Sequence, residues 1–154
     1  MKLGTRGRYA VMAILDLALH EKKGPVSLSS ISERQNISLS YLEQIFNKLR
    51  RRDIVSSTRG AGGGYSLSRG ADTIYIADVI QAVDEPMRAT RCEPNSQKGC
   101  MLNGVKCLTH HLWADLGDQI ISYLKSVSLE DALNRGQNKS ASKSYSFMYE
   151  GTNA

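Results

Sequence analysis

A glycine-rich run, Gly60-Ala61-Gly62-Gly63-Gly64, separates two short segments with the composition of β-strands. Glycine adopts positive φ at little cost, so this run predicts a tight turn. Residues 54–59 and 65–68 flank it and predict the two strands of a hairpin. The run holds more glycines than a two-residue turn requires. We therefore favour a role in binding as well as in folding, while the simpler interpretation is a hairpin turn alone.

Three helical segments precede the hairpin. Apolar residues recur at helical spacing over residues 6–21, with Thr5 as a candidate amino-terminal cap. Residues 26–36 predict a short helix that is capped by Ser27 and followed by a turn. A third helix, capped by Ser38 or Ser40, runs to residue 52. A short helix, a turn and an amphipathic helix predict a helix-turn-helix, and the hairpin then forms the wing of a winged helix.

The remaining chain predicts a fourth helix over residues 72–83, an irregular loop with all three cysteines, and a long amphipathic helix. The long helix has no obvious partner in so small a domain, so we expect it to pair with its copy in a homodimer. Packing on the winged helix is the alternative. The fold class is mostly α with a small β-hairpin, a winged helix-turn-helix plus a long dimerisation helix. We expect a DNA-binding domain (1–83), a cluster-binding loop (84–110), a dimerisation helix with a short last helix (111–133) and a disordered tail (134–154).

Charge is divided unevenly along the chain. Residues 1–70 hold 12 Lys and Arg against 5 Asp and Glu, whereas residues 71–154 hold 8 against 10. A basic amino-terminal half suits a polyanionic partner, although it is also compatible with a solvated face. Side chains near the start of a recognition helix read bases in the major groove, basic side chains bind phosphates, and a wing arginine can enter the minor groove. The candidate DNA-binding residues are Ser38, Ser40, Tyr41, Glu43, Gln44, Arg50, Arg51, Arg59 and Gly60.

The cysteine segment predicts a metal site. Its pattern is Cys92-x7-Cys100-x6-Cys107-x2-His110. Zinc sites usually contain closely spaced cysteine pairs, which this segment lacks, and long gaps suit a loop around a larger cluster. Three thiolates are soft ligands of the kind that iron–sulfur clusters need. His110 lies three residues after Cys107 in a helical stretch, so it is a better fourth ligand than His111.

Taken together, these residues resemble the bacterial winged-helix family of iron–sulfur cluster regulators typified by IscR. The resemblance covers about residues 1–133. It rests on Gly7-Arg8-Tyr9-Ala10-Val11, Ile31-Ser32-Glu33-Arg34-Gln35, Ser38-Leu39-Ser40-Tyr41-Leu42-Glu43-Gln44, Arg59-Gly60 with Gly62-Gly63-Gly64-Tyr65, Val83-Asp84-Glu85, Arg91-Cys92 and Cys107-Leu108-Thr109-His110.

The resemblance implies a homodimer with one 2Fe–2S cluster per chain on Cys92, Cys100, Cys107 and His110. It implies repression of iron–sulfur assembly genes when the cluster is present, and binding of other promoter sites when it is absent. The iron–sulfur assembly machinery is the expected cluster donor. Relatives that sense nitric oxide use three cysteines without this histidine, so His110 argues against that branch.

Other functional classes fit less well. The apolar run in residues 9–19 is too short to span a membrane and contains Asp16, so we expect a cytoplasmic protein. Neither an acid–base pair nor a nucleophile constellation stands out, so we expect no enzyme. An iron–sulfur electron-transfer protein explains the cysteines but not the winged helix. A regulator of the same fold with structural zinc, or one that senses nitric oxide or redox state, stays open as an alternative.

Overall fold

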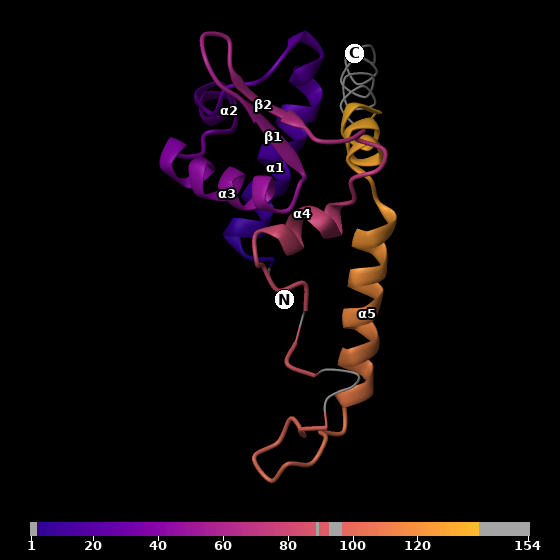
Figure 1. Cartoon of the computed structure of the whole chain (residues 1–154). Helices are drawn as coiled ribbons and strands as arrows, with labels where there is room; N and C mark the ends of the chain where they lie inside the picture. Colours follow the sequence, from indigo (N-terminus) through magenta and orange to yellow (C-terminus); the bar gives the residue numbers. More distant parts are fainter. Residues whose placement is uncertain (1–2, 89, 93–96, 139–154) are drawn as a thin grey trace, which may run out of the picture.

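A computed structural model describes residues 3–88, 90–92 and 97–138 of the chain (Figure 1). These residues form a mostly helical molecule with one antiparallel hairpin, which confirms the predicted fold class. In chain order, the elements are α1 (Thr5–His20), the 3-10 helix η1 (Glu21–Lys23), α2 (Leu28–Gln35), α3 (Leu39–Arg51), β1 (Val55–Thr58), β2 (Gly64–Leu67), α4 (Ile76–Ala82) and α5 (His110–Ser126). Residues 129–138 are helical as well.

Helices α2 and α3 form the predicted helix-turn-helix. The Ser27 hydroxyl accepts a hydrogen bond from Ser30 N at 3.2 Å and caps α2, as its sequence position predicted. Asn36 ends α2 in the left-handed conformation, with a φ of 53°. The Ser32 hydroxyl then donates to Ile37 O at 2.6 Å across the turn. These local contacts fix the direction in which α3 leaves the turn.

The hairpin packs against the start of the helix-turn-helix. Its strands pair antiparallel from Val55 opposite Leu67 to Thr58 opposite Gly64. Residue 65 exchanges two backbone hydrogen bonds with Val26, at 2.9 and 2.8 Å. A Cβ at Gly64 would collide with the backbone of Val26, so only glycine allows this close approach. The contact with Val26 therefore holds the part of β2 next to the turn, while turn residues 59–62 are exposed.

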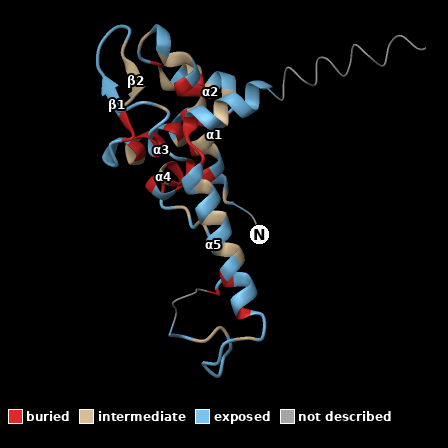
Figure 2. Ribbon diagram, turned by 90° about the vertical axis from the view of Figure 1, so that its right-hand side faces the viewer, coloured by how far each residue is buried: buried red, intermediate tan, exposed pale blue. Residues whose placement is uncertain are grey.

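One hydrophobic core holds α1, α2, α3, α4 and the hairpin together. Figure 2 shows the buried residues concentrated where these elements meet. Phe46 of α3 is fully buried and contacts the Tyr65 ring edge-on at 4.9 Å between centroids. Asp16 is the notable polar group in this region, because its buried carboxylate binds Arg34 and Gln35 and so joins α1 to α2.

Two helix starts differ from the sequence prediction. Thr5 is the first residue of α1 and not its cap; the cap is Gly4, whose N–H donates to Glu85 Oε1 at 2.8 Å. Helix α4 begins at Ile76, four residues later than predicted. Residues before it are extended and pair with the segment after α5, through Ile76 N to Val127 O and Leu129 N to Ile74 O, both at 2.9 Å. Both corrections arise from long-range contacts.

The carboxyl-terminal helix is longer than predicted. Residues 134–138, which we expected to begin a disordered tail, are helical. Ser128 and Asp131 cap this helix, with Ser128 N donating to Asp131 Oδ2 at 3.0 Å and Asp131 N to Ser128 Oγ at 3.1 Å. Arg135 of this helix donates a hydrogen bond to the Tyr123 hydroxyl of α5 at 2.8 Å and so links the two helices. The rest of the predicted tail, residues 139–154, lies outside the described residues.

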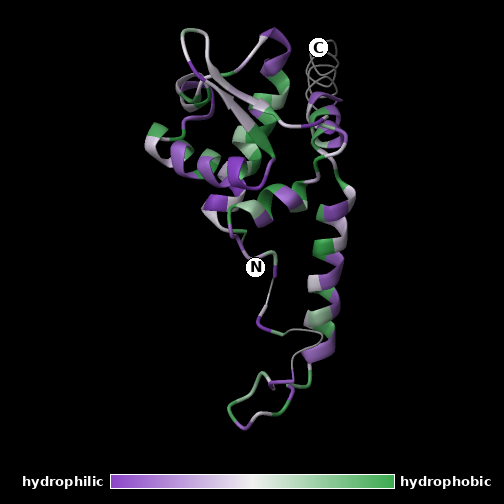
Figure 3. Cartoon of the chain, in the orientation of Figure 1, coloured by the Kyte–Doolittle hydropathy of each residue, from purple (hydrophilic) through white to green (hydrophobic). Residues whose placement is uncertain are grey.

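Helix α5 projects away from the core (Figures 1 and 2). Among its 17 residues, only His110 and Ala114 are buried. Leu112, Trp113 and Tyr123 are exposed apolar residues, and Figure 3 shows hydrophobic residues recurring along its length. Its main contacts with the core are made to α4. An exposed apolar helix of this kind favours a partner, and its pairing in a homodimer stays a prediction. In the described part of the chain, no helix is long and apolar enough to cross a membrane.

Candidate DNA interface and cysteine–histidine centre

The residues predicted to read DNA lie on the outer surface of α3 and at its start. Ser38, Ser40, Glu43 and Gln44 are exposed. Tyr41 is half-buried because its ring packs edge-on against Tyr9 of α1, at 5.9 Å between centroids. Arg50 and Arg51 are exposed at the other end of the helix. Hydrophilic residues recur along most of α3 (Figure 3).

The wing residues lie at the free end of the hairpin. Arg59 and Gly60 are exposed, and Gly60 has a φ of 103°, which favours glycine. Gly62 also has a positive φ, of 76°. The hairpin tip and α3 lie on the side of α1 that faces away from α5 (Figure 1). This is the arrangement in which a helix could enter a groove while the wing contacts the neighbouring backbone.

A small cleft lies between the start of α1 and the predicted recognition helix. Its lining residues are Arg6, Tyr41, Gln44, Ile45 and Lys48, and its volume is about 60 Å³. The sequence places Lys48 on the polar face of α3, at one helical turn from Gln44. Nothing in the sequence indicated that Arg6 shares that surface, because the contact depends on how α1 crosses α3.

The chain turns sharply between α4 and the cysteine loop, and this turn contacts both α1 and α3. Asp84 has a φ of 55°, and its carboxylate accepts a hydrogen bond from Lys48 Nζ at 2.8 Å. The hydrogen bond and the positive charge of Lys48 lower the pKa of Asp84. Glu85 accepts from Gly4 N, and Arg6 Nη1 donates to Val83 O at 3.4 Å. The segment that leads to Cys92 is thereby tied to the candidate DNA-reading elements.

The predicted ligands converge in space. Ligand atoms of Cys92, Cys100 and His110 all lie within 4.8 Å of one another. Cys107 adjoins this group, with its Sγ 4.0 Å from Cys92 Sγ. Two thiolates on one tetrahedral metal, at about 2.3 Å each, stand about 3.8 Å apart, so this spacing suits metal ligation. Cys107 N also donates to Cys100 Sγ at 2.9 Å, and such hydrogen bonds to sulfur tune iron–sulfur clusters.

His110 is buried, whereas its neighbour His111 is exposed. One ring nitrogen of His110, Nδ1, lies 3.6 Å from Cys100 Sγ. The other, Nε2, is buried and has no hydrogen-bond partner among the described residues. A buried nitrogen without a partner is costly, and a bond from the ring to a metal offsets that cost. The donor set of thiols and imidazole therefore fits an iron–sulfur cluster.

The three thiols differ in their surroundings. Burial raises the pKa of Cys92, and the neighbouring thiols of Cys107 and Cys100 raise it further. Hydrogen bonds from the Cys100 thiol and the Thr109 hydroxyl lower the pKa of Cys107. Thiolates are the metal-binding form, so Cys107 is better prepared for ligation than Cys92. Because Cys92 loses its proton less readily, we expect metal binding to release protons and to strengthen as pH rises.

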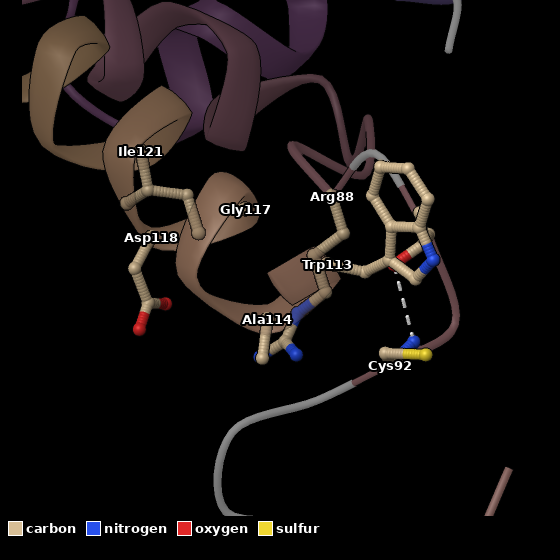
Figure 4. Close-up of a pocket in the computed structure, with 8 residues that line it drawn as sticks. Arg88, Cys92, Trp113, Ala114, Gly117, Asp118 and Ile121 are labelled. Carbon is tan, nitrogen blue, oxygen red and sulfur yellow. Dashed lines mark hydrogen bonds between the residues drawn. The ribbon is translucent and has the colours of Figure 1, made fainter. Parts of the chain in front are cut away.

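A narrow cavity of about 10 Å³ lies beside Cys92 (Figure 4). Trp113, Ala114 and Gly117 of α5 line it together with Arg88. A space of this size holds at most about one water molecule. Helix α5 therefore lies beside the buried Cys92 and also carries His110.

Comparison with known proteins agrees with this geometry. Residues 3–135 match the model of the Rrf2 family, described as iron-dependent transcriptional regulators. The chain belongs to the Rrf2 family. Rrf2 relatives include the HTH-type transcriptional regulator IscR of Xenorhabdus nematophila, 57% identical over 85% of this chain and 78% of that protein. IscR of Escherichia coli O1:K1 is 52% identical over 87% of this chain and 81% of that protein.

Solved Rrf2 structures share the fold. The structure of CymR, the global cysteine regulator of B. subtilis, superposes with a TM-score of 0.73 at 32% identity, over 88% of this chain and 98% of that one. T. potens IscR superposes with a TM-score of 0.70 at 35% identity, over 88% of each chain. The chain is accordingly a DNA-binding transcription regulator of the Rrf2 fold, and its relatives are named as regulators and not as enzymes.

Proposed function

We propose that this chain acts as a homodimer that binds double-stranded promoter DNA and is controlled by a bound 2Fe–2S cluster. It is mainly a repressor of iron–sulfur cluster assembly genes, and its cluster-free form acts at other promoters. The observation that carries the proposal is the group formed by the buried Cys92 and His110 and the half-buried Cys100 at the start of α5, in the same chain as an exposed polar recognition helix.

Four residues of each chain would hold one cluster: Cys92, Cys100, Cys107 and His110. Three thiolates and a neutral imidazole give a 2Fe–2S core one fewer negative charge than four thiolates, so such a cluster is easier to reduce. The imidazole is also a weaker ligand that can be protonated, so the site should release the cluster readily. Ready loss suits a sensor, whereas an electron-transfer protein needs secure retention.

The proposed DNA contacts divide by chemistry. Gln44 can pair with adenine and Glu43 can accept from the amino group of cytosine. Ser38, Ser40 and Tyr41 can donate to phosphates, and Arg50 and Arg51 add positive charge at the far end of α3. Arg59 and Gly60 would place the wing against the neighbouring groove.

Glu43 gives the interface a means of rejecting sites. A carboxylate beside DNA is costly unless it finds a donor, so sites without a suitably placed cytosine are disfavoured. Glu43→Ala should therefore gain affinity for mismatched sites, and unchanged discrimination in that variant would remove this role.

Dimerisation through α5 would bring in a second recognition helix and wing from the other subunit. Leu112, Leu116, Ile120, Tyr123 and Leu124 recur at helical spacing along α5, as an interhelical seam requires. A dimer reads two half-sites at fixed separation, so a change at the cysteine loop can alter which sites fit. We place the protein in the cytoplasm, where its DNA target lies and where the iron–sulfur assembly machinery can donate the cluster.

The direct test is anaerobic reconstitution, followed by a visible spectrum and by iron and sulfide analysis. We expect red-brown absorption and about two irons and two sulfides per wild-type chain. Cys107→Ala and His110→Ala should lose or weaken the cluster, whereas the matched control His111→Ala should retain it. A colourless protein that holds zinc would overturn the proposed signal and favour a structural zinc site.

A further inference from the structure

The cleft between α1 and α3 brings two cations to one surface. Arg6 comes from the first turn of α1 and Lys48 from the third turn of α3, more than forty residues apart in sequence. Tyr41 and Gln44 add a hydroxyl and an amide to the same cleft. Positive charge with neutral donors in a small open cleft is the chemistry that binds a phosphate diester.

Both cations retain donors for a further acceptor. Among the described residues, Arg6 donates one hydrogen bond, to the Val83 carbonyl at 3.4 Å, and its guanidinium carries five N–H groups. Lys48 Nζ donates to Asp84 Oδ2 at 2.8 Å, and an ammonium carries three N–H groups. Neither side chain is buried, so DNA can reach both.

Asp84 is the anion that forms an ion pair with Lys48 in this structure. Its side chain is 61% exposed, so the ion pair lies at the protein surface. The neighbouring acid, Glu85, is used differently, because its carboxylate accepts from Gly4 N at the start of α1. A carboxylate and a phosphate oxygen compete for one ammonium, since Lys recognises both as point charges.

We propose that Arg6 and Lys48 bind one backbone phosphate of DNA in the cleft beside Tyr41 and Gln44, and that Asp84 masks Lys48 in the DNA-free protein. The inference rests on the proposed DNA-binding function and adds a binding site to it. Asp84 lies eight residues before Cys92, at the start of the segment that leads to the candidate cluster ligands.

The two members of the ion pair should have opposite effects on DNA binding. Lys48→Gln removes one of the two cations on that phosphate in each chain, or two cations per dimer. The slope of log affinity against log salt should then become less steep, by up to about 1.8. Asp84→Asn should raise affinity on the order of fivefold at low salt, because it frees Lys48 and removes a charge that repels phosphate. Asparagine tolerates the left-handed conformation of residue 84 as aspartate does.

The experiment measures affinity of the full-length, reconstituted protein for one mixed-sequence duplex of about 30 base pairs, roughly three helical turns, over a range of salt. Lys125→Gln is the matched control, because it removes an exposed lysine from α5. Arg6→Gln should reproduce the effect of Lys48→Gln. Thermal unfolding of each variant establishes that the fold is intact.

The measured slopes and affinities distinguish failure of the phosphate site from failure of DNA binding as a whole. A reduced slope for Lys48→Gln and increased affinity for Asp84→Asn support the phosphate site. If wild type binds DNA but Lys48→Gln keeps the slope of the Lys125→Gln control, the inference is wrong. If both substitutions at the ion pair weaken binding, the pair serves the fold and the inference is again wrong. If wild type binds no duplex, the proposed function itself fails.

Discussion

Replacing Asp16 with alanine tests how the helix-turn-helix is held on α1. The Asp16 side chain is 2% exposed. Its carboxylate accepts hydrogen bonds from Arg34 Nη2 at 2.6 Å, from Arg34 Nε at 3.1 Å and from Gln35 Nε2 at 2.7 Å. These contacts join the middle of α1 to the end of α2. Asp16→Ala removes the shared acceptor and leaves both donors without it.

The expected loss of stability is about 2–3 kcal/mol. Removing one partner of a fully buried ion pair costs about 3–5 kcal/mol. The Arg34 side chain is 35% exposed, so it can turn towards water and recover part of that cost. Alanine also favours a helix by up to about 0.7 kcal/mol over aspartate, which offsets a little more. The remainder is a large fraction of the total stability of a small domain.

Urea unfolding followed by circular dichroism measures this difference, at one protomer concentration because a dimer's stability depends on it. Asp118→Ala on α5 is the matched control, since Asp118 is an exposed helical aspartate and carries the same helix-propensity gain. We expect the control to raise stability by at most about 0.7 kcal/mol, the helix-propensity gain alone. Equal stability of the two variants would refute the reasoning from buried hydrogen bonds.

Three further perturbations test other parts of the structure. Burial raises the pKa of Asp16, but hydrogen bonds from Arg34 and Gln35 lower it more. The ionised Asp16 carboxylate therefore stabilises the folded protein above about pH 4, and this stabilisation is lost as pH falls through the lowered pKa. The stability difference between wild type and Asp16→Asn should shrink below about pH 4, and a constant difference would contradict this. Gly64→Ala should push the wing away from Val26, cost about 1–3 kcal/mol and weaken DNA binding; unchanged stability and affinity would show that the close approach is dispensable. Ile120→Glu should yield monomers in sedimentation, while the exposed control Gln119→Glu stays dimeric; a dimer in both would exclude α5 as the interface.

The elements set by local signals could be predicted from the sequence. Ser27 and Asn36 bound α2 through contacts within a few residues, and the glycines at 60 and 62 set the hairpin turn through their own φ angles. The start of α4 could not be predicted. It depends on pairing of residues 74–76 with residues 127–129, some fifty positions away. The same holds for Gly4, whose capping partner is Glu85.

In the candidate site, too, the local features could be predicted from the sequence and the long-range contacts could not. Cysteine spacing and the position of His110 three residues after Cys107 predicted four ligands, and the structure brings ligand atoms of Cys92, Cys100 and His110 within 4.8 Å of one another. The predicted shared helix face was wrong, because α5 begins at His110 and Cys107 precedes it. The contact of Asp84 with Lys48 left no trace in the sequence, because it requires the turn after α4 to meet α3. The periodicity of polar residues in the sequence predicts which face of a helix is polar. The residues that this face contacts depend on the tertiary fold.

The central claim is that a cluster on the cysteine–histidine centre controls which DNA the protein selects. Selection from a random duplex pool, with reconstituted wild type and with Cys107→Ala as the cluster-free form, tests it most directly. We predict that both proteins bind, with wild type enriching a set of sites that the variant does not. Identical enriched sets at equal affinity would contradict cluster control and leave a DNA-binding regulator whose signal lies elsewhere.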